Sequence, residues 1–415
     1  MTIGIVPAIL LYIIACVWFT YTCVLSDAST SPMANLFTVK LPNLLLSIIG
    51  KIFGAKTVES VKKASEKALV VLYLVVVLGA WSIMFTYGYD FISKSEHVSS
   101  HHKISGYFVF IACMWSWRKA STSRPGYITE RNLTKYDNYP YDNLLYVNKN
   151  CPTTGFRKLP RSKYDRFTNR HVARFDHFCA WVDNSIGEEN YRFFLLFLAV
   201  HIGMCAYGAI VTYHLLLGEI EDKNLFNAIF FNAQTGQEVN ADFWVISHFM
   251  FMRHFQLSAI MVLMGAMAVV LGLFMAFHLY MAATGITTNE YYKWRQVKKW
   301  HKKEKSKYEE AVKAGKIKSK TVANATMRAL PDVDVGCVGP TSQPKEEVQD
   351  DGPAKGEVND PGPYPANIYN KGIVENFKEI IFPRSLRADA KARFAAALRS
   401  ARVVDSTVPP KTKST

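Results

Sequence analysis

Long apolar runs without Asp, Glu, Lys or Arg constrain the fold of this chain more than any other feature of its sequence. A helix of about 20 apolar residues crosses the hydrocarbon core of a bilayer. The runs therefore predict an all-α polytopic membrane protein with about five transmembrane helices. The predicted spans are residues 3–25, 69–87, 104–117, 193–217 and 256–282.

Three apolar segments need separate interpretation. Residues 3–25 could be a signal peptide, but they lack a basic leader and are longer than a usual signal core, which favours an uncleaved anchor. Residues 41–53 are too short to span and are predicted to form an interfacial helix. Residues 104–117 are the shortest predicted span, and the charges of the neighbouring loops support their crossing.

Lys and Arg in the loops predict the orientation of the spans. Residues 26–68 hold six lysines, and residues 293–320 hold twelve Lys or Arg against three Glu, whereas residues 219–255 are acidic overall. Five spans place the basic loops in the cytosol and the amino terminus in the lumen. If residues 104–117 did not cross, the basic loops on either side of them would lie on opposite sides of the membrane.

This topology divides the chain into four parts. Residues 1–118 and 193–282 are predicted membrane regions, residues 119–192 are a small irregular cytosolic region between spans three and four, and residues 283–415 are a cytosolic tail.

The tail itself has three predicted parts. Residues 331–365 are rich in Pro, Gly, Asp and Glu, which predicts a disordered linker. Residues 386–404 are predicted to form an amphipathic helix. Between them, residues 367–382 are predicted to be an ordered segment. The side chains expected to pack there are Ile368, Tyr369, Ile373, Phe377, Ile380 and Ile381.

The formal net charge of +15 suits contact with an anionic cytosolic membrane surface. It would also suit nucleic acid, but the sequence has no zinc-finger, helix-turn-helix or RNA-binding signature. We therefore expect the lipid bilayer as a partner and no nucleic acid. Four of the seven cysteines lie in apolar segments, so no disulfide framework is implied.

The cytosolic region between spans three and four contains an acid, an imidazole and a thiol within four residues, at Asp176, His177 and Cys179. A carboxylate can fix the tautomer of an imidazole, and the imidazole can then take the proton of a neighbouring thiol. A free thiol with a pKa of about 8.5 is only a few per cent ionised at neutral pH, so such a base raises its reactivity. A chance neighbourhood of Cys and His is the alternative interpretation.

The residues around this group carry a resemblance. Asp176-His-Phe-Cys179, followed by Trp181, Asn184, Gly187 and Asn190, resembles the signature of the DHHC-type protein S-acyltransferases, or palmitoyltransferases. Residues 287–290, Thr-Thr-Asn-Glu, are similar to a second motif of that family, and residues 367–376 to a third. Residues 139–146 resemble a branch associated with endoplasmic reticulum membranes.

The resemblance implies a two-step acyl transfer. An acyl-CoA, palmitoyl-CoA in most family members, would acylate Cys179, and a membrane-associated substrate protein with a cytosolic cysteine would then receive the acyl group. His177 and Asp176 would complete the catalytic set in residues 119–192. The protein is expected to be multi-pass in the endoplasmic reticulum or Golgi. The implied supporting residues are Thr288 as the partner of Asp176, then Glu290, Asn367 and Asn376.

Two further groups of polar residues remain open. Arg161, Lys163 and Arg174 are candidates for the CoA phosphates, although a solvated role suits each equally well. Intramembrane histidines are a functional hint by default. The residues of this kind, none of them in a family motif, are His201, His214 and His278.

The family usually holds this region around two zinc ions, and here the sequence departs from it. The first set of ligand positions holds Cys151, Thr154, Tyr164 and His171, and the second holds Asp165, Thr168, Phe178 and Ser185. A structural zinc ion needs four ligands, mostly Cys or His. We therefore predict no zinc. Packing of aromatic side chains is expected to hold the region instead, through Phe156, Tyr164, Phe167, Phe175 and Phe178.

Two alternatives to an acyltransferase follow from the same residues. The lost ligand positions also suit a catalytically idle membrane scaffold derived from such an enzyme. The intact Asp176, His177 and Cys179 favour the enzyme, because an idle site has no physical need for all three. A transporter is disfavoured, since the apolar spans are unbroken and carry no paired charges.

Overall fold

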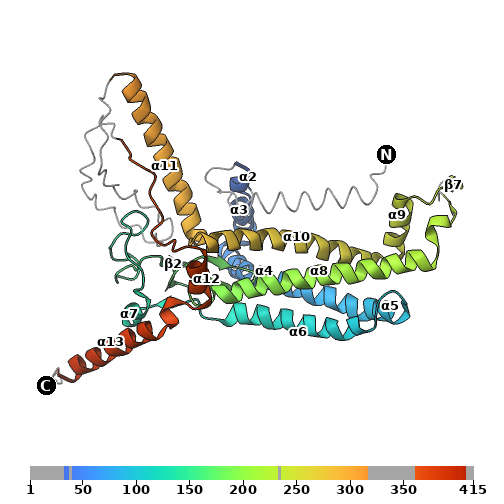
Figure 1. The fold of residues 1–415 in the computed structure, drawn as a ribbon, viewed down its shortest axis with the longest axis horizontal. Coiled ribbons are helices and arrows are strands. Elements are labelled where there is room, and N and C mark those ends of the chain that lie inside the picture. The colour runs from blue at the N-terminus through green and yellow to red at the C-terminus, as the bar shows by residue number, and fades with distance from the viewer. Residues whose placement is uncertain (1–31, 37–39, 232–234, 316–359, 408–415) are drawn as a thin grey trace. The chain divides into compact units, whose positions relative to one another are not determined.

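The computed structural model describes residues 32–36, 40–231, 235–315 and 360–407, and these are mostly helical. Two compact units can be distinguished (Figure 1). The first comprises the described residues up to Ser121 with Ala180–Asp183 and Leu196–Ala276. The second comprises Thr122–Cys179, Asn184–Leu195 and the described residues from Phe277 onward. The predicted first span, residues 3–25, lies outside the described residues.

Long helices dominate the first unit. Among the described residues, three helical segments are long and apolar enough to cross a membrane: Lys67–Lys94, Tyr191–Asp222 and Phe255–Ala283. They contain the predicted spans 69–87, 193–217 and 256–282. Residues 104–117 are helical as well, but their helix is not among these three. The count of five spans therefore stays a prediction.

The helices of this part of the chain have the following bounds. They are α2 (Pro32–Asn35), α3 (Leu41–Phe53), α4 (Ala55–Ile83), the π-helical turn η3 (Met84–Gly88), α5 (Tyr89–Lys94), α6 (His101–Thr122), α8 (Tyr191–Asp222), the turn η5 (Leu225–Asn227), α9 (Phe243–Arg253) and α10 (Phe255–Ala283). A short hairpin joins β6 (Phe230–Phe231) and β7 (Glu238–Val239). The predicted interfacial helix at residues 41–53 coincides with α3.

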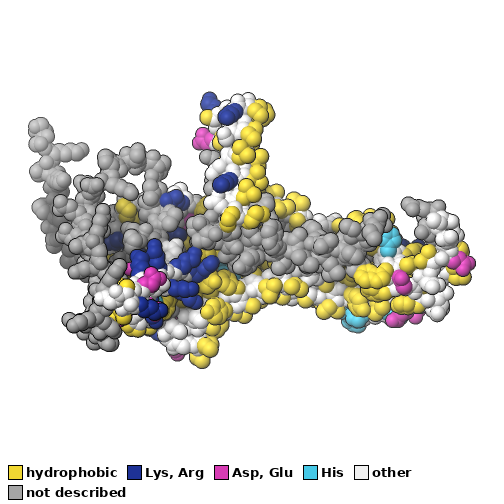
Figure 2. Space-filling model, turned by 90° about the horizontal axis from the view of Figure 1, so that it is seen from above, with side chains coloured by type: hydrophobic (Ala, Val, Ile, Leu, Met, Phe, Trp, Pro, Cys, Tyr) yellow, Lys and Arg dark blue, Asp and Glu magenta, His cyan; other side chains and the backbone are white. Residues whose placement is uncertain are grey.

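The surface of the long helices is apolar. Val71, Val75 and Leu273 are each more than half exposed, and Figure 2 shows hydrophobic side chains along the helices. Such a surface is unfavourable in water and favourable in lipid. The same view shows Lys and Arg side chains gathered on one part of the surface.

Short strands form the core of the second unit. Strands β1 (Tyr127–Ile128), β3 (Arg170–Val172) and β2 (Lys163–Asp165) make an antiparallel sheet in that order. Strands β4 (His177–Cys179) and β5 (Asn184–Ile186) form a hairpin, in which Cys179 pairs with Asn184 and His177 with Ile186. The segment before β2 contains two short helices, η4 (Glu130–Asn132) and α7 (Leu133–Tyr136).

The C-terminal helices belong to the second unit as well. They are α11 (Thr288–Lys313), α12 (Ile373–Ile381), the turn η6 (Arg384–Leu386) and α13 (Ala388–Thr407). The predicted helix at residues 386–404 matches α13. Most of the predicted linker lies outside the described residues, but Tyr364 lies within them and packs against Trp294 and His301.

The packing predicted for residues 367–382 is partly wrong. Tyr369 and Ile380 are buried, but Ile368, Ile373 and Ile381 are each about half exposed or more. The buried face of α12 instead carries Asn376 and Glu379, because these polar side chains are bonded to other segments of the second unit, as described below.

Candidate active site

The β4–β5 hairpin positions the thiol and the imidazole. Successive side chains on a strand point to opposite faces, so His177 and Cys179 share one face and Phe178 lies on the other. The ring of Phe178 stacks on Phe167 with centroids 4.5 Å apart. Cys179 is buried, and the His177 side chain is about one fifth exposed. The hairpin thus brings a nucleophile and its base together without any distant contact.

Asp176, which directly precedes β4, is held by two segments. Its carboxylate accepts a hydrogen bond from Nδ1 of His177 at 2.6 Å. It also accepts the main-chain N–H of Thr288 at 2.8 Å and the Thr288 hydroxyl at 2.7 Å. Thr288 is the first residue of α11, where unpaired N–H groups and the helix dipole stabilise an anion. The contact implied for Thr288 by the resemblance is present.

Electrostatics favours a charged imidazole beside this carboxylate. Burial alone would lower the pKa of His177, but hydrogen bonds to Asp176 and Cys179 outweigh it and raise the pKa to about 10. Burial would likewise raise the pKa of Asp176, but the bond from His177 and the contacts with α11 lower it to about 2. At neutral pH the ring therefore holds a proton between a carboxylate and the sulfur.

A capping box orients the start of α11. The Thr287 hydroxyl accepts the N–H of Glu290 at 3.2 Å, and the Glu290 carboxylate accepts the N–H of Thr287 at 2.9 Å. This reciprocal pair fixes the helix N-terminus, and with it the N–H and hydroxyl that Thr288 presents to Asp176. Glu290 thus supports the site indirectly, by fixing the helix start that presents Thr288 to Asp176.

Comparison with known proteins finds a matching domain and several similar proteins. Residues 146–295 match the family model described as DHHC palmitoyltransferase, a range that includes Asp176, His177, Cys179 and Thr288. This chain carries a DHHC palmitoyltransferase domain. The chain is also 27% identical over 346 residues to palmitoyltransferase SWF1 of Yarrowia lipolytica, covering 82% of this chain and 84% of the relative. Palmitoyltransferase ZDHHC4 of Mus musculus is 32% identical over 182 residues, or 43% of this chain and 53% of that protein.

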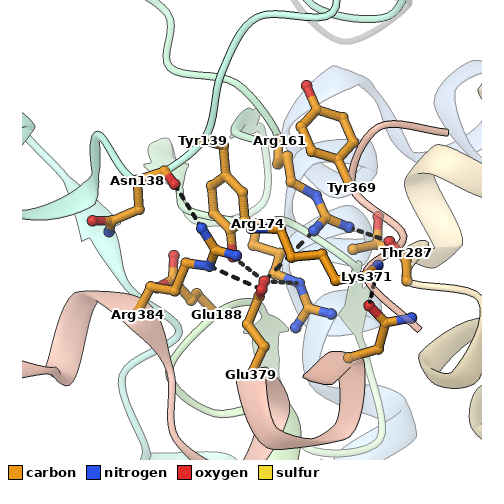
Figure 3. A network of polar contacts seen from close by, with 12 residues as sticks. Asn138, Tyr139, Arg161, Arg174, Glu188, Thr287, Tyr369, Lys371, Glu379 and Arg384 are labelled. Carbon is orange, nitrogen blue, oxygen red and sulfur yellow. Dashed lines mark hydrogen bonds and ion pairs between the residues drawn. The ribbon is translucent and has the colours of Figure 1, made fainter. Parts of the chain in front are cut away.

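A buried ion pair anchors the second motif of the DHHC domain. Arg161 and Glu290 are each 1% exposed and form a two-pronged pair, with Nε to Oε1 at 2.8 Å and an Nη to Oε2 at 2.6 Å. The guanidinium also donates to the main-chain oxygen of Gly285 at 2.8 Å. Arg161 therefore ties the loop before β2 to the turn before α11 (Figure 3).

The same network extends to α12, the helix that carries Asn376 of the third motif. The carboxylate of Glu379 on α12 accepts from the Tyr139 hydroxyl and from Arg384 at 2.9 Å. It also lies 3.7 Å from Arg161 and 3.8 Å from Arg174 (Figure 3). Arg161 and Arg174 are therefore buried in ion pairs. The suggestion that these two arginines bind CoA phosphates is wrong, because their charges are already neutralised inside the protein.

Glu379 was missed by sequence reasoning, although a weak signal was available. It lies three residues after Asn376 on a short helix, so the two polar side chains share one face. Two polar side chains on one face of a helix that also carries apolar residues suggest a polar contact on that face. Nothing in the sequence indicates that the partner of that face is Arg161.

The two asparagines of the third motif bind the end of α10. The Asn376 amide donates to the main-chain oxygen of Ala283 at 2.8 Å, and the Asn367 amide donates to that of Thr284 at 3.2 Å. Carbonyls at a helix C-terminus lack partners within the helix, so these amides cap them. Asn367 and Asn376 thereby support the turn that leads to Thr287, and neither reaches the thiol.

Other signature positions serve the fold of the hairpin. The Asn190 side chain accepts the N–H of Gly187 at 2.9 Å and donates to the main-chain oxygen of Ser185 at 2.9 Å. A Cβ on Gly187 would lie 2.7 Å from the main-chain oxygen of Pro125, so only glycine fits there. The Asn184 amide donates to the main-chain oxygen of Ser123 at 2.8 Å. These contacts fix the strand that pairs with Cys179.

The second set of zinc-ligand positions has become a hydrogen-bonded cluster. Asp165 is buried, and its carboxylate accepts the Ser185 hydroxyl at 2.5 Å and the Thr168 hydroxyl at 2.9 Å. These three residues join β2, the following turn and β5, as a metal would. The fourth position, Phe178, offers no ligand atom. The residues present do not fit zinc.

The first set offers two possible ligands. His171 is 1% exposed, and neither ring nitrogen has a hydrogen-bond partner among the described residues, which is compatible with a ligand. However, the Tyr164 hydroxyl bonds to Asn169 at 3.4 Å, and Phe156 and Tyr164 pack against the imidazole. Burial lowers the pKa of His171 to about 4, so the ring stays neutral without a metal. With Cys151, it supplies only half of a tetrahedral site.

The predicted aromatic packing is therefore only partly right. Phe175 is buried and Phe156 packs in the cluster around Leu159, but Phe167 is 69% exposed. Phe167 lies at the tip of the turn after β2 and covers Phe178 from the solvent side. The polar cluster at Asp165 holds that end of the sheet instead.

Proposed function

We propose that this chain is a protein S-acyltransferase that transfers a fatty acyl group, palmitoyl by analogy with its relatives, from acyl-CoA to a cysteine of a target protein. The observation that carries the proposal is the group Asp176, His177 and Cys179, with Asp176 held at the N-terminus of α11. The alternative, an idle scaffold, gains no support from this geometry.

The first step transfers the acyl group to the enzyme. His177 already holds the proton of Cys179 in an ion pair, and the thiolate sulfur attacks the carbonyl carbon of the thioester. The bond from that carbon to the CoA sulfur breaks, and the imidazolium gives its proton to the CoA thiolate. In the second step a substrate thiol gives its proton to His177 and attacks the Cys179 thioester. Cys179 then leaves as thiolate and regains the proton.

Charge near the site supports an anionic donor. Burial and the neighbouring charges of Lys158 and Lys163 lower the pKa of Lys293 to about 8. Lys158 and Lys293 are buried, whereas Lys163 is only partly buried, so its ammonium group is the one of the three that a phosphate group can reach. In the sequence, Phe193 opens an apolar span 14 residues after Cys179, which suits a donor with an apolar tail and a charged head. We propose a multi-pass protein of the endoplasmic reticulum or Golgi with this site in the cytosol.

The test of the function is labelling of the purified full-length protein with an alkyne-bearing palmitoyl-CoA. We expect a hydroxylamine-sensitive thioester that mass spectrometry maps to Cys179. Cys179→Ser should abolish the label, and Cys151→Ser should retain it. Absence of the label from folded wild-type protein would favour the scaffold, and equal labelling of all three proteins would refute the assignment of the nucleophile.

We also propose that the protein works without structural zinc, because hydroxyl bonds to Asp165 occupy one ligand set and the other is half complete. Elemental analysis should find well under one zinc per chain, and a chelator should change neither the melting temperature nor autoacylation. Structural zinc contributes on the order of 10 kcal/mol in small modules, so its removal would be obvious. One zinc per chain, or unfolding on chelation, would contradict the proposal.

A further inference from the structure

A second histidine lies against the proposed base. His278 is on the last turns of α10 and is 1% exposed, and its ring centroid lies 5.7 Å from that of His177. Ligand-type atoms of Asp176, His177 and His278 all lie within 4.8 Å of one another. Of the three intramembrane histidines noted in the sequence, this one meets the site. By contrast, His201 bonds the Tyr73 hydroxyl at 2.8 Å within the first unit.

His278 is itself anchored from the start of α8. The hydroxyl of Tyr191 lies 3.0 Å from Nδ1 of His278 and 3.4 Å from its main-chain oxygen. Tyr191 is buried, and Arg174 lies 5.9 Å from its ring centroid. A buried hydroxyl between two acceptor positions of one residue fixes that residue's ring, because leaving the hydroxyl unpaired would be costly.

Phe194 completes the contact with the base. Its ring centroid lies 5.0 Å from those of both His177 and His278, with edge-to-face geometry in each case. Three rings therefore touch pairwise. Asp176 constrains the Nδ1 side of the His177 ring, while His278 and Phe194 constrain the ring's tilt. Both constraints act on the angle at which the imidazole faces Cys179.

We propose that His278, held by Tyr191, is a positioning residue that fixes the His177 imidazole against Cys179. The inference rests on the proposed function, and it adds a residue that lies in none of the three motifs. The ionisable groups around His278 are Asp176, His177 and Tyr191. Since His177 carries the proton of the ion pair, His278 works as a neutral ring, because a second positive charge beside His177 would oppose the first.

The experiment measures single-turnover acylation of Cys179 by palmitoyl-CoA as a function of pH in two variants. His278→Phe keeps a ring but loses the bond to Tyr191, and Tyr191→Phe removes one hydroxyl. Removing the hydrogen-bonded supporter of a metal-bound histidine typically costs about 10- to 100-fold in activity, and we expect the same scale here. We expect a loss in this range for His278→Phe and about tenfold for Tyr191→Phe, with KM for the donor within about twofold.

The pH profile separates positioning from folding. A displaced His177 stabilises the thiolate less, so the low-pH limb of acylation should move to higher pH in both variants. A merely structural role would lower the melting temperature and leave the limb and the maximal rate per folded molecule unchanged, which would overturn the inference. If His278→Phe does not fold, the pH profile of Tyr191→Phe still distinguishes a positioning role from a structural one.

Matched controls come from α8, the helix that carries Tyr191. Tyr213 and His214 on α8 are an adjacent tyrosine and histidine with ring centroids 5.5 Å apart, and both are exposed. Tyr213→Phe and His214→Phe should leave the rate and the pH profile unchanged. If wild-type Cys179 is acylated and His278→Phe and Tyr191→Phe have the wild-type rate and pH profile, the inference alone is rejected. If the wild type is not acylated, the function on which the inference rests is rejected.

Discussion

Replacing Asp176 by asparagine is expected to slow acylation of Cys179 at pH 7 by about 10³- to 10⁴-fold, the scale seen when the acid of a nucleophile–imidazole–acid group is made neutral. Asp176 accepts from His177 at 2.6 Å and twice from Thr288. An amide nitrogen in place of either oxygen would face a donor. The imidazole would then lose both its orientation and the charge that supports its proton.

The pH dependence of the acylation rate should differ between the wild type and Asp176→Asn. In the wild type the raised pKa of His177 keeps the ring protonated up to about pH 10, so the rate should be nearly flat between pH 6 and 8. In Asp176→Asn the pKa of the ring falls, because burial now dominates. The thiolate then has no paired imidazolium, so the rate should rise with pH across this range instead of staying flat.

The matched control is Asp183→Asn, an acid in the turn between β4 and β5 that pairs with Lys67. This pair is partly exposed, so little change in rate is expected. A flat pH profile in Asp176→Asn, or an equal loss in Asp183→Asn, would contradict the assignment of Asp176 as the partner of the base. The measurement is single-turnover acylation of the full-length protein.

Arg161→Met is expected to destabilise the full-length protein by about 3–5 kcal/mol, the usual cost of removing one partner of a buried ion pair. The substitution would leave Glu290 buried without its two-pronged partner and Gly285 without a donor. It would also remove the guanidinium that lies 5.1 Å from the Tyr139 ring centroid and 4.8 Å from that of Tyr369. The melting temperature in a lipid or detergent environment measures this loss.

Two further variants test whether charge is the cause. Adding Glu290→Gln to Arg161→Met removes the uncompensated negative charge and should recover part of the lost stability. Arg166→Met, on an exposed residue of the turn after β2, should change stability by no more than about 0.5 kcal/mol. A melting temperature in Arg161→Met equal to that of Arg166→Met would show that the pair is not the anchor we describe.

The sequence alone determined the features that depend on neighbouring residues. Three predicted spans coincide with long apolar helices, since the length and hydropathy of a run suffice to identify a membrane-crossing helix. Asp176, His177 and Cys179 lie within four residues, and any extended conformation places His177 and Cys179 on one face. The capping pair of Thr287 and Glu290 is also a local feature, since the two residues have the three-residue spacing of a capping box.

The tertiary structure decided the features that join distant segments. Arg161 and Glu290 are 129 residues apart, and no local pattern distinguishes Arg161, which is buried, from Arg166, which is exposed. His278 is likewise about 100 residues from His177 and meets it only where α10 ends. Hydropathy and spacing report on the nearest neighbours along the chain. The choice of a buried partner depends instead on which charged and aromatic groups the folded chain removes from water together, because an unpaired buried charge is too costly to keep.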